Sequence, residues 1–242
     1  MKTLVLTDNV IIYEGLKKIF DDYNYDHVDF AHSHIKSDIW SHEDFRGFDK
    51  AINVKQDQEF LINNYNLIIS GHCKQFFPKK LVNQIRCINI HPGYNPINRG
   101  WYPQVFAIVN DLPIGATIHE MDEKLDHGPI ITRAMIEKHE EDTSLEIYTR
   151  VINEELKLFK ENFKEIISNT YKTITIAGEN SHFFDKEDFK NLSEIDLDKK
   201  VSFREALDFL RAMTHGDYKN AYFIDKKGDK VFVSIKLNKE NG

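Results

Sequence analysis

The stretch that decides the fold and the chemistry of this chain is Cys87-Ile88-Asn89-Ile90-His91-Pro92-Gly93-Tyr94-Asn95-Pro96-Ile97-Asn98-Arg99-Gly100. Its apolar start predicts a short buried strand over residues 86–90, and the two-residue spacing of Asn89 and His91 places both side chains on one face. A second motif, Asp126-His127-Gly128-Pro129-Ile130-Ile131, begins 35 residues after His91. An amide, an imidazole and a carboxylate can together stabilise an oxyanion, move a proton and orient the imidazole. These are the requirements of acyl transfer.

Strands and helices alternate on both sides of this stretch. Apolar runs predict strands over residues 3–7, 65–70, 115–119 and 130–135, and apolar residues at helical spacing predict helices over 10–20, 104–110 and about 143–168. This order is typical of an α/β sheet, in which ligands bind at the carboxyl ends of the strands. The turn of residues 7–9 lacks the glycines of a dinucleotide site, so we do not expect NAD or FAD.

The character of the chain changes near residue 178. We predict one domain over residues 1–178 and a smaller α+β element over residues 179–242, with a helix over 203–213 and a hairpin of two strands over 218–223 and 230–237. The second part is too small for a large core of its own. We therefore expect it to pack on the first domain or on a second copy of the chain, and we predict a homodimer.

Composition excludes several classes of protein. A net charge of −7 over 242 residues argues against a nucleic-acid binder, which needs clustered Lys and Arg. The apolar run at the N-terminus is far too short for a signal peptide, and no stretch reaches the about 20 residues of a membrane span, so we expect the cytoplasm and no membrane partner. The two cysteines, Cys73 and Cys87, fit reduced thiols, and neither they nor the histidines of residues 26–58 show metal-ligand spacing.

Several motifs of this sequence resemble those of a known enzyme family. Asn89-Ile90-His91-Pro92, Arg99-Gly100, Thr117-Ile118-His119 and Asp126-His127-Gly128-Pro129 are similar to motifs of the formyltransferases that use 10-formyltetrahydrofolate. Arg99-Gly100-Trp101-Tyr102-Pro103 and the short C-terminal part are most similar to the sugar-nucleotide branch. The resemblance implies a Rossmann-like catalytic domain, 10-formyltetrahydrofolate as cosubstrate, no metal, and a dTDP-linked amino-dideoxy sugar as acceptor, with dTDP-4-amino-4,6-dideoxyglucose first.

The resemblance also implies roles for particular residues. The catalytic triad would be Asn89, His91 and Asp126. The folate contacts would be Gly71, Phe76, His119, Glu120, Met121, Asp122 and Leu125, and the contacts to the sugar nucleotide would be Lys74, Arg99, Trp101 and Tyr102. Several of these residues have a plainer alternative: a histidine that caps a turn before proline for His91, a solvated lysine for Lys74, a structural salt bridge for Arg99, packing for Trp101 and Tyr102, and a structural role for His119.

One departure from the family and several open alternatives remain. The family usually has serine-leucine-leucine after His-Pro, where this chain has Gly93-Tyr94-Asn95, so the shape of the acceptor pocket is not fixed by the resemblance. Rival functions are formyl transfer to another amine, such as a 3-amino sugar nucleotide or glycinamide ribonucleotide, hydrolysis of formyltetrahydrofolate, and binding without turnover. Whether His91 acts as a base or as an imidazolium also stays open.

Overall fold

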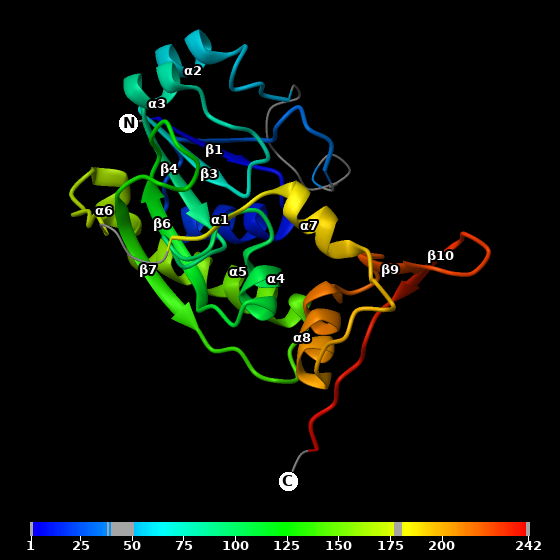
Figure 1. Cartoon of the computed structure of the whole chain (residues 1–242). Coiled ribbons are helices and arrows are strands. Elements are labelled where there is room, and N and C mark those ends of the chain that lie inside the picture. The colour runs from blue at the N-terminus through cyan, green and yellow to red at the C-terminus, as the bar shows by residue number, and fades with distance from the viewer. Residues whose placement is uncertain (1, 38, 40–50, 177–180, 241–242) are drawn as a thin grey trace.

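A computed structural model describes residues 2–37, 39, 51–176 and 181–240 of the chain, and a six-stranded sheet forms its centre (Figure 1). The strand order is β2-β1-β3-β4-β6-β7. These strands are β1 (Thr3–Thr7), β2 (Val28–Ala31), β3 (Leu67–Gly71), β4 (Arg86–His91), β6 (Ile114–Glu120) and β7 (Ile130–Ile136).

The predicted Rossmann-like sheet is confirmed, with one refinement in strand direction. Strands β2, β1, β3 and β4 are parallel, whereas β6 runs antiparallel to β4 and β7 antiparallel to β6. The direction of β7 follows from its connection: a loop without a crossover helix joins β6 to β7, and such a loop joins antiparallel neighbours. That loop carries Asp126. It leaves β6 beside Cys87, near the start of β4, and folds back so that Asp126 lies beside Asn89 and His91.

Helices cover both faces of the sheet. On one face, α1 (Val10–Asp22) and α5 (Ser144–Glu161) pack on Ile69 and Ile88. On the other face, α2 (Gln58–Asn64) and α3 (Lys79–Gln84) pack on Ile68 and Cys87. Neighbouring residues of a strand point to opposite faces, so the continuous apolar runs of β3 and β4 serve both layers. Asn89 and His91 interrupt this pattern on the second face.

The single long helix predicted to end near residue 168 is two helices. Asn162 leaves helical geometry, with φ −104° and ψ 12°, and separates α5 from α6 (Phe163–Ser168). Its side-chain amide donates to the carbonyl of Leu158, 2.8 Å away. Asparagine competes for backbone partners in this way, which favours helix ends over helix interiors. The apolar spacing continues across the break because Phe159 and Phe163 both pack against Phe20.

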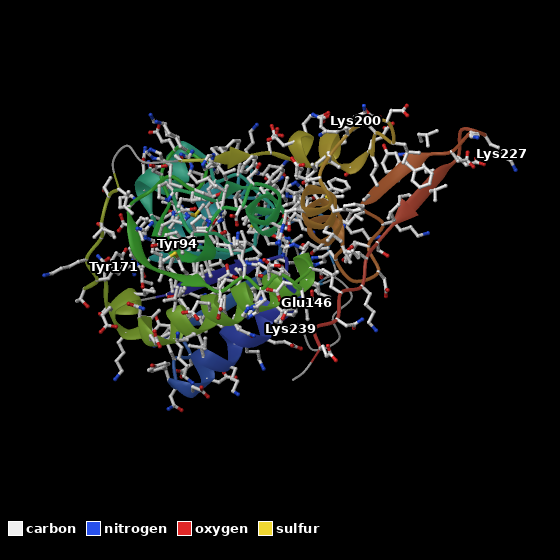
Figure 2. All side chains as sticks on the ribbon, turned by 60° about the horizontal axis from the view of Figure 1, so that its bottom comes forward. Tyr94, Glu146, Tyr171, Lys200, Lys227 and Lys239 are labelled. Atoms are coloured by element: carbon white, nitrogen blue, oxygen red, sulfur yellow. The ribbon has the colours of Figure 1, made fainter. Side chains whose placement is uncertain are left out.

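The C-terminal element contains the predicted helix and hairpin and two further elements. It comprises β8 (Phe183–Phe184), α7 (Lys186–Ser193), α8 (Phe203–Met213), β9 (Ala221–Ile224) and β10 (Lys230–Val233). Helix α8 packs on α4 (Pro103–Val109) through a third core cluster that includes Ile108 and Met213. The hairpin β9–β10 projects away from the sheet, and Figure 2 shows Lys227 at its tip. The boundary predicted near residue 178 falls among residues 177–180, outside the described residues.

The two cysteines are free thiols. Burial raises the pKa of the Cys87 thiol to about 12, and burial together with the nearby charge of Asp8 raises the pKa of the Cys73 thiol as well. Both thiols are therefore protonated at neutral pH, which makes them poor nucleophiles. Within the described part of the chain, no helix has the length and apolarity required to cross a bilayer.

Candidate active site

Asn89, His91 and Asp126 converge at the end of β4, as the sequence predicts, and His119 joins them. The amide nitrogen of Asn89 donates to Asp126 Oδ1 across 3.1 Å, and His91 Nδ1 lies 3.6 Å from Asp126 Oδ2. His119 Nε2 lies 3.7 Å from Asp126 Oδ1. We call these four residues the Asp126 cluster. A buried carboxylate between two imidazoles and an amide can stabilise positive charge on either ring.

The tautomer of His91 is fixed by a backbone carbonyl. His91 Nε2 lies 2.7 Å from the carbonyl oxygen of Asn98, which can only accept, so Nε2 carries a hydrogen. The other ring nitrogen, Nδ1, therefore faces Asp126. Its 3.6 Å distance from Oδ2 is longer than a hydrogen bond, so Asp126 acts on the ring through its charge and leaves Nδ1 open to a third group.

His119 belongs to the cluster because β4 and β6 are antiparallel. Asn89 pairs directly with His119 across these strands, so both side chains stand on the same face. His119 Nδ1 donates to the carbonyl of Glu120 across 2.7 Å, which leaves Nε2 as an acceptor toward the amide of Asn89 at 3.4 Å. Sequence reasoning placed His119 on the folate side of the site. Only the pairing register could have revealed its contact with Asn89.

The two amide hydrogens of Asn89 are directed at Asp126 and His119. The contact to His119 Nε2 is the long one, so that hydrogen is the one more easily released. A developing oxyanion is a stronger acceptor than a neutral imidazole nitrogen. Asn89 can therefore serve as the predicted oxyanion donor after a turn of its amide toward the substrate.

Several hydrogen-bond donors hold Asp126 in the left-handed backbone region, which most residues other than glycine avoid. It adopts φ +49°, and the side-chain amide of Asn95 donates to its backbone carbonyl across 3.1 Å. The backbone N–H of Gly100 donates to Oδ2 across 3.0 Å. Burial alone would raise the pKa of Asp126, but the neighbouring imidazoles of His91 and His119 and the N–H of Gly100 outweigh burial and hold the pKa well below its usual range. Asp126 is therefore ionised at neutral pH.

Gly93 is required by the close approach of the loop to His91. A Cβ on Gly93 would lie 2.4 Å from the Asn98 carbonyl oxygen and 2.5 Å from His91 Nε2, the two atoms of the bond that fixes the imidazole. Thr117 ties the same loop to β6: its hydroxyl donates to the Gly93 carbonyl and accepts from the N–H of Asn95. Gly93 and Asn95, which lie where this chain differs from the usual family sequence, thus help to hold His91 and Asp126 in place.

The predicted folate contacts fall in two places. Glu120 is the last residue of β6, and Met121, Asp122 and Leu125 lie on the loop to β7, which also carries Asp126. This loop is closed tightly, since a Cβ on Gly128 would lie 1.9 Å from the Glu120 carbonyl oxygen. Phe76 lies on the loop after β3 and is 59% exposed. Gly71 lies at the end of β3 and faces α1, where a Cβ would lie 2.8 Å from Ile12, so the absence of a side chain allows the helix to pack closely.

The residues predicted to contact the sugar nucleotide also lie in two places, after β3 and beside the C-terminal element. Lys74 is exposed after β3, and its N–H donates to the buried Asp8 carboxylate across 2.7 Å. Arg99, Trp101 and Tyr102 all contact the C-terminal element. The Arg99 guanidinium donates to Ser181, Lys186 Nζ lies 3.9 Å from the Trp101 ring centre, and Tyr102 stacks on Phe189 at 4.1 Å.

Unpartnered polar atoms mark the loop beside the cluster. Of the buried side-chain polar atoms that lack a hydrogen-bond partner among the described residues, Asn95 Oδ1, Asn98 Nδ2 and Arg99 Nε all lie in this loop. Buried polar groups are normally satisfied, so these atoms are suited to a polar ligand or water. The described residues contain no group of three His, Cys, Asp or Glu side chains arranged to hold a metal ion.

Comparison with known proteins agrees with this geometry. The formyl transferase family model matches residues 24–162, more than half of the chain. The chain belongs to the formyl transferase family. A second model, described as the N-formyltransferase dimerization C-terminal domain, matches residues 188–239 of this formyltransferase chain.

Relatives with curated functions and solved structures extend the likeness. The chain is 43% identical to the dTDP-4-amino-4,6-dideoxyglucose formyltransferase of Mycobacterium tuberculosis over 180 residues, which cover 74% of this chain and 76% of the relative. A 4-N formyltransferase from Francisella tularensis superimposes with a TM-score of 0.91 at 44% identity, covering 99% of this chain and 98% of the other. A sugar N-formyltransferase from Shewanella sp FDAARGOS_354 gives 0.94 at 36% identity, covering 100% and 99%.

Replacement of Gly93 by alanine tests the support of His91. The new methyl group overlaps the Asn98 carbonyl and the His91 ring. We expect a loss of about 1–3 kcal/mol in the free energy of unfolding from overpacking, and loss of the slowly exchanging His91 Nε2 proton resonance in NMR spectra. Gly15→Ala is the matched control, because its methyl group meets only the side chain of Leu156, and it should keep the resonance. An unchanged His91 resonance in Gly93→Ala would contradict the assignment.

Proposed function

We propose that this chain transfers the formyl group of 10-formyltetrahydrofolate to the amine of a dTDP-linked amino-dideoxy sugar, with dTDP-4-amino-4,6-dideoxyglucose as the acceptor to test first. The observation that carries the proposal is the convergence of Asn89, His91 and Asp126 at the end of β4. The 43% identity to a relative named for that acceptor supports the choice of sugar. Such a product would serve surface polysaccharide synthesis, and the cytoplasm is the expected site.

The reaction needs a neutral amine to attack the formyl carbon. A C–N bond forms to the sugar amine, the carbonyl oxygen becomes negative, and the bond from the formyl carbon to N10 of the folate then breaks. The amine loses one proton and N10 gains one. Asn89 donates to the oxyanion, and a donor of this kind contributes about 3–4 kcal/mol to lowering the barrier.

His91 Nδ1 is the nitrogen placed to handle the proton, since Nε2 is committed to the Asn98 carbonyl. As a base, Nδ1 takes the proton of the attacking amine, and the ionised Asp126 stabilises the imidazolium that forms. As an imidazolium from the start, the same atom donates to the oxyanion. The two roles have opposite pH dependence: a base loses activity as pH falls through its pKa, whereas an imidazolium loses activity as pH rises through it.

The residues of the site fit both substrates. The loop of residues 119–126 presents its backbone and the partly buried Met121 and Leu125 beside the cluster, where a flat pterin ring would be held. On the acceptor side, Lys74 and Arg99 supply positive charge suited to a diphosphate.

Turnover with a panel of acceptors tests the proposal. We expect mass spectrometry to detect a formylated product from 10-formyltetrahydrofolate and dTDP-4-amino-4,6-dideoxyglucose. The dTDP-3-amino sugars and glycinamide ribonucleotide serve as competing acceptors in the same assay. Formylation of a 3-amino sugar alone would move the acceptor amine to carbon 3. Release of formate without any formylated product would contradict transfer and favour the hydrolase.

Substitution of the cluster tests its role. His91→Asn and Asp126→Ala should each lower kcat by a factor of about 10³ or more while the protein stays folded, because each removes a group that acts on developing charge. The controls are His27→Asn and Asp26→Ala, which change two exposed residues immediately before β2 and should turn over like the wild type. Near wild-type turnover in a folded His91 or Asp126 variant would refute the assignment.

We further propose a homodimer formed through the C-terminal element. Large apolar side chains are exposed there on both the helix and the hairpin: Phe203 is 91% exposed on α8, and Phe232 is 43% exposed on β10. Exposed apolar patches of this kind mark protein interfaces. The match of residues 188–239 to a model described as a dimerization domain supports a second copy of this chain as the partner.

The mass in solution tests the dimer. Light scattering at micromolar concentration should give twice the chain mass, and Phe203→Glu should halve it by placing a charge in the interface. Ile11→Glu is the control, because Ile11 is 55% exposed on α1, outside the C-terminal element. A monomeric wild type would refute the proposal.

A further inference from the structure

We propose that β8, a strand of the C-terminal element, is a positioning element of the Asp126 cluster and acts through the backbone of Gly100. The inference applies to any amine acceptor. It rests on the proposed function only in taking Asp126 as the catalytic carboxylate.

Residues 99–101 form hydrogen bonds to β8 on one side and to Asp126 on the other. Strand β5 (Arg99–Gly100) pairs in parallel with β8, with Gly100 opposite Phe184. The N–H of Arg99 donates to the His182 carbonyl across 3.1 Å, and the N–H of Trp101 donates to the Phe184 carbonyl across 2.8 Å. The N–H of Gly100, between them, points the opposite way and donates to Asp126 Oδ2 across 3.0 Å. Alternate N–H groups of one strand therefore join β8 to the carboxylate.

The backbones of β8 and Gly100 pack closely against each other. Gly100 adopts φ +94°, a conformation that glycine tolerates and other residues avoid. A Cβ there would lie 2.1 Å from the Phe184 carbonyl oxygen. The backbone of β8 thus occupies the space of the missing side chain. A shift of β8 must move Gly100, and with it the donor to Asp126.

Stacked aromatic rings attach β8 to the catalytic domain. The Phe184 ring stacks on Phe106 of α4, with centres 4.0 Å apart and planes at 5°. Phe106 is 5% exposed, so this anchor belongs to the core. The next element of the tail adds a second anchor, because Phe189 of α7 stacks on Tyr102. Phe184 is therefore the side chain through which β8 can be loosened.

The position of β8 affects the protonation of the Asp126 cluster through the Gly100 N–H. The Gly100 donor is one of the groups that favour the charged form of Asp126. A loosened β8 weakens this donor and lets the carboxylate move relative to His91 and His119. The proton affinities of both imidazoles then change, because each senses the charge of Asp126 within 4 Å.

The experiment compares Phe184→Ala with Phe184→Tyr, which keeps the stacked ring, and with Phe60→Ala, which removes a 46% exposed ring from α2. In the full chain, the NMR titration midpoints of His91 and His119 should shift in Phe184→Ala and match the wild type in the other two. In steady-state assays, kcat should fall about 10- to 100-fold in Phe184→Ala, with little change in the KM for folate. Light scattering should give the wild-type mass.

Unchanged imidazole midpoints in folded Phe184→Ala would overturn the inference, even if kcat fell, because the loss would then be structural. A wild type that formylates no amine would refute the proposed function, while the titrations would still decide the role of β8. If Phe184→Ala does not fold, Phe184→Leu is measured in the same way. If neither folds, hydrogen exchange of the wild type decides: protection of the Gly100 amide together with the Arg99 and Trp101 amides supports the inference, and fast exchange at Gly100 overturns it.

Discussion

The buried carboxylate of Asp126 is the constraint on which the rest of the site depends. A charge at 7% exposure is costly unless donors and cations surround it. Here the amide of Asn89, the N–H of Gly100 and two imidazoles supply that environment. The same contacts hold Asn89 and His91 beside the carboxylate. The arrangement that stabilises the charge therefore also positions the groups of the proposed chemistry.

The loop of residues 93–100 transmits this constraint to the rest of the molecule. Asn98 fixes the tautomer of His91, Asn95 holds the backbone of Asp126, and Gly100 holds its side chain. Thr117 attaches the loop to β6, and β8 attaches it to the C-terminal element. A strand of the C-terminal element thus pairs with the residue whose N–H donates to Asp126.

The features that sequence predicted well are those with local causes. Apolar periodicity located most of the strands of the central sheet and the helix of residues 203–213, since burial imposes that pattern directly. The two-residue spacing of Asn89 and His91 placed them on one face of a strand. The two-residue strands β5 and β8 were missed because their residues gain a partner only when distant parts of the chain meet. The break at Asn162 was missed because the apolar spacing continues across it.

The sequence by itself determined the residue types of the chemistry: an amide and an imidazole on one strand, and a carboxylate on a later loop. The tertiary structure alone decided their partners. The antiparallel return of β6 put His119 beside Asn89, and the packing of α1 assigned Gly71 to the helix layer. Contacts of Arg99, Trp101 and Tyr102 with residues 181–189 likewise have no local signature. Spacing along the chain specifies which groups share a strand, whereas strand order and register specify which groups touch.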